Sequence, residues 1–149
     1  MIQWAREEER AGGYRGPEPF LVFREKVERA REALADFLER AREAGKKVYG
    51  YGASTKGMVT LQYCRVTPSQ VEAIAERNPD KVGMLTPGTD IPICSEEEMR
   101  AADPDYLLVL PWHFLPEFLR REEAYLRGGG KMVVPIPELR VHSLEGVPG

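Results

Sequence analysis

The sequence has few cysteines, lacks long apolar runs and has no excess of positive charge, and each shortage excludes a class of protein. Its two cysteines, Cys64 and Cys94, are not part of closely spaced Cys/His pairs, so no metal site is expected. No apolar run reaches the roughly 20 residues of a membrane span, and the first ten residues do not resemble a signal peptide. A formal net charge of −3 argues against nucleic acid as the main partner. We therefore expect a cytoplasmic protein that binds neither a membrane nor nucleic acid.

The 149 residues, 42% of them hydrophobic, suit one folded domain. Residues 1–19 are polar, rich in glycine and proline, and without periodicity, so we expect a lead-in segment there. Residues 20–149 are predicted to form a single domain. It begins with apolar residues at steps of three and four over residues 20–44, which predict a long amphipathic helix that Gly45 ends.

Beyond Gly45, short apolar strands alternate with helices. Strands are predicted over residues 46–51, 71–75, 91–93, 106–110 and 131–136. Helices are predicted over 55–64, after a capping box formed by Ser95 and Glu98, and over 116–126. The run over 106–110 has no polar alternation, which is typical of a strand buried on both faces. The fold class is therefore α/β: a small doubly wound, Rossmann-like parallel sheet with helices on both faces, preceded by the long N-terminal helix.

The first predicted strand ends in a glycine-rich turn, at the edge of the sheet where such folds bind ligands. The turn reads Gly50-Tyr51-Gly52-Ala53-Ser54-Thr55-Lys56-Gly57. Its glycines permit a tight turn and the close approach of a phosphate. The amides that follow lie at the positive end of a helix dipole, Ser54 and Thr55 add hydroxyl donors, and Lys56 adds a full charge. We favour phosphate binding here over an ordinary strand–helix turn.

Two common phosphate-binding motifs do not match this turn. The dinucleotide fingerprint has glycine three residues after Gly52, where Thr55 stands, so close packing of the helix on the strand must be achieved differently. The Walker loop has lysine after glycine, whereas Lys56 precedes Gly57, so ATP hydrolysis is not expected.

Two more segments are predicted to reach the same edge of the sheet. Glu76 follows the second strand, where dinucleotide sites place a ribose-binding acid, and Asn78 is close by; a solvated loop carboxylate is the alternative. After the fourth strand, Trp112 can stack on a base or sugar, and His113 is the one weak candidate for a catalytic residue. A packed aromatic cluster is the alternative there. With no nucleophile and base pair in the pattern, the sequence looks incomplete as a catalyst.

Four motifs together resemble a known family. They are GYGASTKG, AERNPDKVGMLTPGTDIPI, PDYLLVLPWHF and GGGKMVVPIPE, and their order and spacing resemble the C-terminal domain of the sugar C-methyltransferases over residues 20–138. Those enzymes act on nucleotide-linked deoxysugars such as dTDP-linked 4-keto sugars. The resemblance implies diphosphate contact by Gly50, Gly52, Ser54, Thr55, Lys56 and Gly57. It also implies that Trp112 and His113 line the sugar-facing cleft.

In that family, a zinc-binding domain and a domain that binds S-adenosylmethionine precede this one. The resemblance therefore implies a module that holds a nucleotide-linked sugar of the dTDP class and is inactive in methyl transfer alone. S-adenosylmethionine is not expected to bind this chain, and its binding is left to a separate methyltransferase chain or domain. The chain is then a fragment or a separate gene product. Two alternatives stay open: an NAD(P)-binding oxidoreductase-like domain, and a scaffold whose helix over residues 20–44 packs against another subunit.

Overall fold

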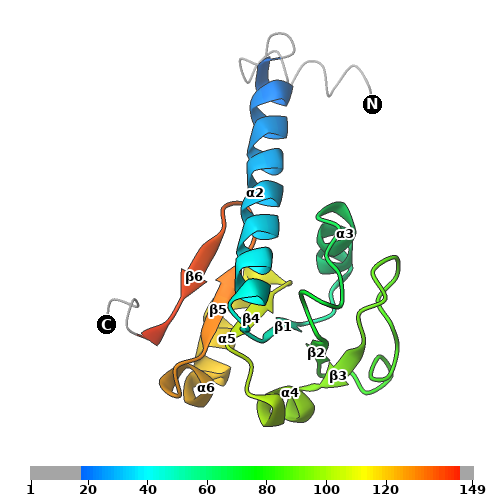
Figure 1. The fold of residues 1–149 in the computed structure, drawn as a ribbon, viewed down its shortest axis with the longest axis vertical. Coiled ribbons are helices and arrows are strands. Elements are labelled where there is room, and N and C mark those ends of the chain that lie inside the picture. Colours follow the sequence, from blue (N-terminus) through cyan, green and yellow to red (C-terminus); the bar gives the residue numbers. More distant parts are fainter. Residues whose placement is uncertain (1–17, 145–149) are drawn as a thin grey trace.

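The computed structural model describes residues 18–144, which form one six-stranded sheet with helices on both faces (Figure 1). The expected lead-in over residues 1–19 lies almost wholly outside the described residues. The strands are β1 (Val48–Tyr51), β2 (Ile74–Glu76), β3 (Ile93–Ser95), β4 (Tyr106–Val109), β5 (Lys131–Val134) and β6 (Arg140–His142). The α/β fold class is confirmed.

The sheet order is β3-β2-β1-β4-β5-β6, and all neighbours pair in parallel except β5 and β6. The chain runs outward from β1 to β3 and then returns to β4 on the other side of β1. The switch point of the sheet therefore lies between β1 and β4, where residues 48–51 pair with 106–109. In β4, Leu107, Leu108 and Val109 are fully buried, as the apolar run predicts. Strand β6 has no counterpart among the predicted strands.

Among the described residues, two helices cover one face of the sheet. The long helix α2 (Glu18–Glu43) extends well beyond the sheet, and the turn after it holds Gly45 at φ +71° (Figure 1). Its apolar stripe packs onto the sheet through Leu34, Leu38 and Ala41. Helix α3 (Thr55–Tyr63) packs beside it through Leu61. The amphipathic helix predicted over 20–44 is confirmed.

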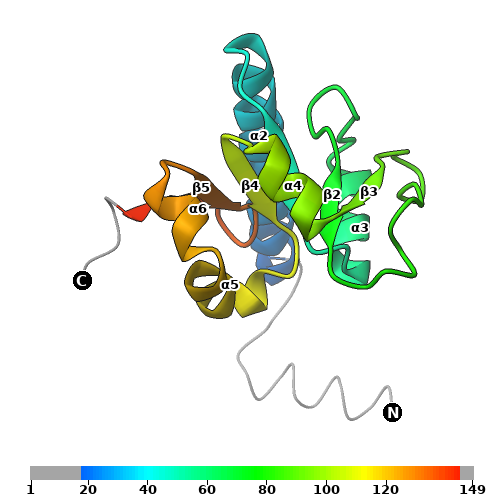
Figure 2. The same cartoon turned by 90° about the horizontal axis from the view of Figure 1, so that it is seen from below.

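The opposite face carries three shorter helices (Figure 2). Helix α4 (Glu96–Ala102) begins with the predicted capping box: the Ser95 hydroxyl accepts from the Glu98 amide, and the Glu98 carboxylate accepts from the Ser95 amide. A 3₁₀ turn η1 (Trp112–Phe114) then leads into α5 (Leu115–Arg121) and α6 (Glu123–Arg127). The prediction of one helix over 116–126 is wrong, because Glu122 leaves helical geometry while its side chain enters the core.

The second and third strands lie a few residues later than predicted. Val71 and Ile91 are fully buried, but they lie in the segments that lead into β2 and β3. Pro92 has no amide to donate to a neighbouring strand, although its carbonyl accepts from Ile74. The apolar pattern thus identifies the buried residues correctly, but it places the backbone pairing of β2 and β3 too early in the chain. Over residues 18–144, no helix combines the length and apolar character needed to cross a membrane.

Candidate functional site

The glycines of the turn between β1 and α3 are required by packing. A Cβ on Gly50 would lie 2.8 Å from the Ile74 side chain. Gly52 has φ +86°, and a Cβ there would lie 2.8 Å from the ring of Pro111. A Cβ on Gly57 would lie 2.5 Å from Leu110 Cβ, so Gly57 brings α3 close to the end of β4. Gly57 thus does the packing that the third glycine of the dinucleotide fingerprint does elsewhere.

Most amides of this turn already have an acceptor. The Gly52 amide donates to the Ala75 carbonyl, and the Ser54 amide donates to the Gly52 carbonyl. Ser54 is the N-cap of α3, and its hydroxyl accepts from the Gly57 amide at 3.1 Å. The first two amides of α3, at Thr55 and Lys56, have no intrahelical acceptor, and none is recorded elsewhere in residues 18–144. The turn therefore offers two amides to an anion.

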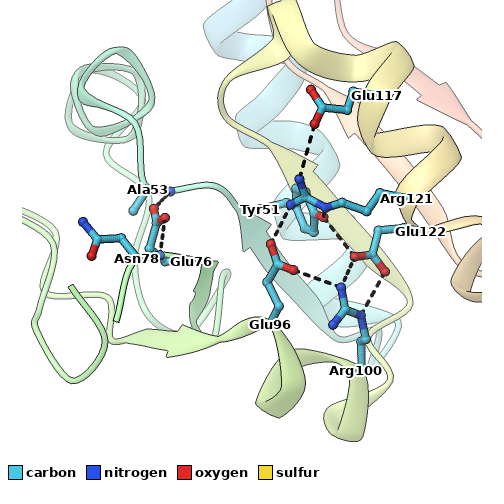
Figure 3. Close-up of polar contacts among 9 residues, drawn as sticks. All are labelled: Tyr51, Ala53, Glu76, Asn78, Glu96, Arg100, Glu117, Arg121 and Glu122. Atoms are coloured by element: carbon cyan, nitrogen blue, oxygen red, sulfur yellow. Dashed lines mark hydrogen bonds and ion pairs between the residues drawn. The ribbon is translucent and has the colours of Figure 1, made fainter. Parts of the chain in front are cut away.

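Ala53 is held at its amide and at its carbonyl by the end of β2 and the loop that follows it. Glu76 Oε2 accepts from the Ala53 amide at 2.9 Å, and Oε1 accepts from the Asn78 amide at 3.0 Å (Figure 3). Lys81 Nζ donates to the Ala53 carbonyl at 3.0 Å. Asn78 Oδ1 accepts from the Asp80 amide, so this side chain shapes the loop. Two backbone amides thus fix the position of the Glu76 carboxylate, and each of its oxygens retains a further lone pair.

A cleft of about 220 Å³ opens at this edge of the sheet. The turn contributes residues 51–54, and the end of β2 and the loop after it contribute Glu76, Arg77 and Lys81. The other wall comes from the start of α4 and from the chain after β4. Its residues are Glu96, Pro111, Phe114, Phe118 and Arg121. The cleft therefore combines cations, carboxylates and an aromatic surface in one place.

Seven residues predicted for the site do not line this cleft: Gly50, Thr55, Lys56, Gly57, Asn78, Trp112 and His113. Lys56 and His113 are exposed, and Trp112 packs against the buried residues beneath α4, α5 and α6. The alternative of a packed aromatic cluster thus describes Trp112. Two phenylalanine rings border the cleft, and Phe114, at 55%, is the more exposed of them.

Sequence reasoning missed Phe114, Lys81 and Arg121. The first two stand in the motifs PWHF and AERNPDKVG, so the sequence marked their segments and not the side chains. Arg121 lies near the end of a helix and carries no motif of its own.

A network of charged groups fixes the wall that carries Arg121 (Figure 3). The Tyr51 hydroxyl, which is buried, donates to Glu122 at 2.9 Å and accepts from Arg121 Nε at 3.1 Å. Arg100 donates to Glu122 through both Nε and Nη2. Glu96 accepts from both arginines, at 2.9 Å and 2.6 Å. The two arginines balance the two glutamates in charge, and Arg121 already donates hydrogen bonds to other side chains of the protein.

The network makes an alkaline pH dependence testable. Burial, followed by the Glu122 carboxylate, raises the pKa of Tyr51 well above its ordinary value of 10. In the unfolded chain this hydroxyl ionises near that value, so its contribution to stability is complete below about pH 10 and is lost as the pH rises further. The free energy of unfolding, measured by urea denaturation between about pH 9 and 11, should therefore fall with pH. It should fall less steeply in Tyr51→Phe, and parallel curves would contradict the assignment.

Comparison with known proteins finds relatives for most of the chain. Residues 1–137 match the family model described as "C-methyltransferase C-terminal domain". The chain is also 36% identical over 138 residues to the C-methyltransferase NovU of Streptomyces niveus. That alignment covers 93% of this chain and 33% of the relative, so the chain spans about a third of the relative's length.

Proposed function

Since this chain belongs to the family of C-methyltransferase C-terminal domains, we propose that it is the nucleotide-sugar-binding module of a sugar C-methyltransferase. The observation that carries the proposal is the cleft at the carboxyl ends of β1, β2 and β4, beside the glycine-rich turn. Ligands of doubly wound folds bind at this position. The ligand is a nucleotide-linked sugar of the dTDP class, with its diphosphate against the turn.

The chemistry of the cleft suits such a ligand. A positively charged side chain in the cleft attracts the diphosphate, and the Thr55 and Lys56 amides, which follow the lining residue Ser54 in the chain, add donors next to it. The remaining lone pairs of Glu76 can accept from hydroxyl groups of a ribose or a sugar. Phe114 offers an exposed ring against which a base can stack.

The methyl donor, S-adenosylmethionine, is assigned to another domain or chain. The described residues 18–144 form one doubly wound sheet, and its switch point is taken up by the site proposed for the nucleotide-sugar. The residues of this chain thus bind and orient the sugar nucleotide, and methyl transfer needs the partner that corresponds to the other two thirds of the relative. Two unpaired cysteines suit a reducing compartment, so we place the chain in the cytoplasm.

Titration calorimetry with dTDP and with a dTDP-sugar tests this function. We expect saturable binding of both ligands, with a Kd of about millimolar or below. Circular dichroism establishes that the sample is folded. A folded sample that takes up neither ligand at millimolar concentration would overturn the proposal.

A second candidate, NAD(P) binding, is favoured by one observation, the position of Glu76 at the end of β2. Acids at that position accept from the adenosine ribose in dinucleotide folds. Binding of NADH in the same calorimeter, without binding of dTDP or dTDP-sugar, would support this candidate over the first.

A further inference from the structure

Four cations surround the glycine-rich turn, and they differ in what they can reach. Lys56 is exposed on the first turn of α3 and does not line the cleft. Lys81, Arg77 and Arg121 do line it. The cation that was expected from the motif alone is therefore outside the cavity in which a ligand would sit.

The carboxylate of Glu76 changes the electrostatics of this corner. Because it accepts from the Ala53 amide, a phosphate cannot use that amide and would lie close to a negative charge. Lys81 donates to the carbonyl of the same residue, so a positive charge is also held at this corner. An ammonium group has three donors, and the recorded contact uses one of them. Two donors remain for phosphate oxygens.

The other two cations of the cleft are less suited to this task. Arg121 donates to Tyr51 and to Glu96, and Glu117 lies 3.8 Å from its Nη1. A phosphate would have to compete with these carboxylates. Arg77 is exposed, and within residues 18–144 no hydrogen bond or ion pair holds its side chain, so binding would have to order it first. Lys81 is half-buried and already held at the turn.

We infer that Lys81, and not Lys56, is the cation that anchors the phosphate of the ligand. The inference rests on the proposed function and names the anchoring residue within it. Lys81 also connects the loop after β2 to the turn between β1 and α3, so its contact with a ligand would affect the position of that loop. A ligand that engages Lys81 therefore bridges two segments that come from different strands.

Calorimetry with dTDP on four variants tests the inference. Lys81→Gln removes the charge and retains a donor for the Ala53 carbonyl, and we expect it to weaken dTDP binding by about tenfold or more, the cost of a lost charge-assisted hydrogen bond. Lys81→Arg should keep the affinity within about threefold. Lys56→Gln, the matched control with the same loss of charge, and Arg77→Gln should each change it by less than about threefold.

Thymidine, which has no phosphate, distinguishes the loss of a phosphate contact from a general disturbance of the turn. Lys81→Gln should bind thymidine as the wild type does, whereas a loosened turn would weaken both ligands equally and would overturn the inference. A loss of dTDP affinity in Lys56→Gln or Arg77→Gln, with Lys81→Gln unaffected, would also overturn it. Failure of the wild type to bind dTDP at all would instead remove the proposed function on which the inference rests.

Discussion

Replacing Gly57 with alanine is expected to lower the free energy of unfolding by about 2–3 kcal/mol, as overpacking of a rigid core does. The added Cβ would lie 2.5 Å from Leu110 Cβ, an atom fixed by fully buried backbone, and 2.9 Å from the Ser54 hydroxyl that caps α3. A Gly→Ala change within a helix normally stabilises it, by roughly 0.5–1 kcal/mol. The expected change in the free energy of unfolding is therefore opposite in sign to the change that helix propensity alone would give. Urea denaturation measures this change.

Gly128→Ala is the matched control for this change. Gly128 has φ −75°, and a Cβ there would meet its nearest atom, the Tyr125 carbonyl oxygen, at an ordinary contact distance of 3.4 Å. The free energy of unfolding of Gly128→Ala should stay within about 1 kcal/mol of the wild-type value. If Gly57→Ala is as stable as Gly128→Ala, then α3 does not depend on close contact with the end of β4.

Replacing Glu122 with alanine should cost about 2–4 kcal/mol, because it removes the acceptor from a buried network. The Glu122 side chain is 3% exposed and binds the Tyr51 hydroxyl together with two nitrogens of Arg100. Arg100 is 44% exposed and can rehydrate, so most of the cost comes from the buried Tyr51 hydroxyl and from the space that the side chain leaves. Thermal or urea denaturation gives the value.

The neighbouring residue provides the control for Glu122. Glu123 is 53% exposed and pairs with Arg127 one helical turn away on the surface. Its replacement by alanine should cost less than about 1 kcal/mol, as is usual for exposed ion pairs. Equal losses for the two variants would show that the network around Glu122 adds nothing beyond a surface pair.

Local signals in the sequence predicted much of this fold. The capping box at Ser95 and Glu98 forms as its pattern indicates, because both partners lie within one helical turn. The unbroken apolar run at residues 106–110 became β4 at the centre of the sheet, because only a strand covered on both faces lacks polar alternation. The glycine-rich turn was located for the same reason: strand, glycine and helix start are adjacent in the chain.

What was missed depends on contacts between distant residues. Glu122 ends α5 because its carboxylate meets Tyr51 and Arg100 across the core, and no pattern within residues 116–126 encodes those partners. Lys81 reaches the turn through a loop whose path is set by the pairing of β2 with β1. Strand β6 is mostly exposed and only three residues long, so it carries too little apolar pattern to be recognised.

The lengths of the outer strands have a consequence for self-association. Both borders of the sheet, β3 and β6, are three-residue strands, and Pro92, which directly precedes β3, lacks an amide proton. Chains polymerise edge to edge when long, flat borders present unpaired backbone groups. This sheet presents few such groups at either edge. Folded molecules are therefore poorly suited to forming fibrils by pairing their edge strands.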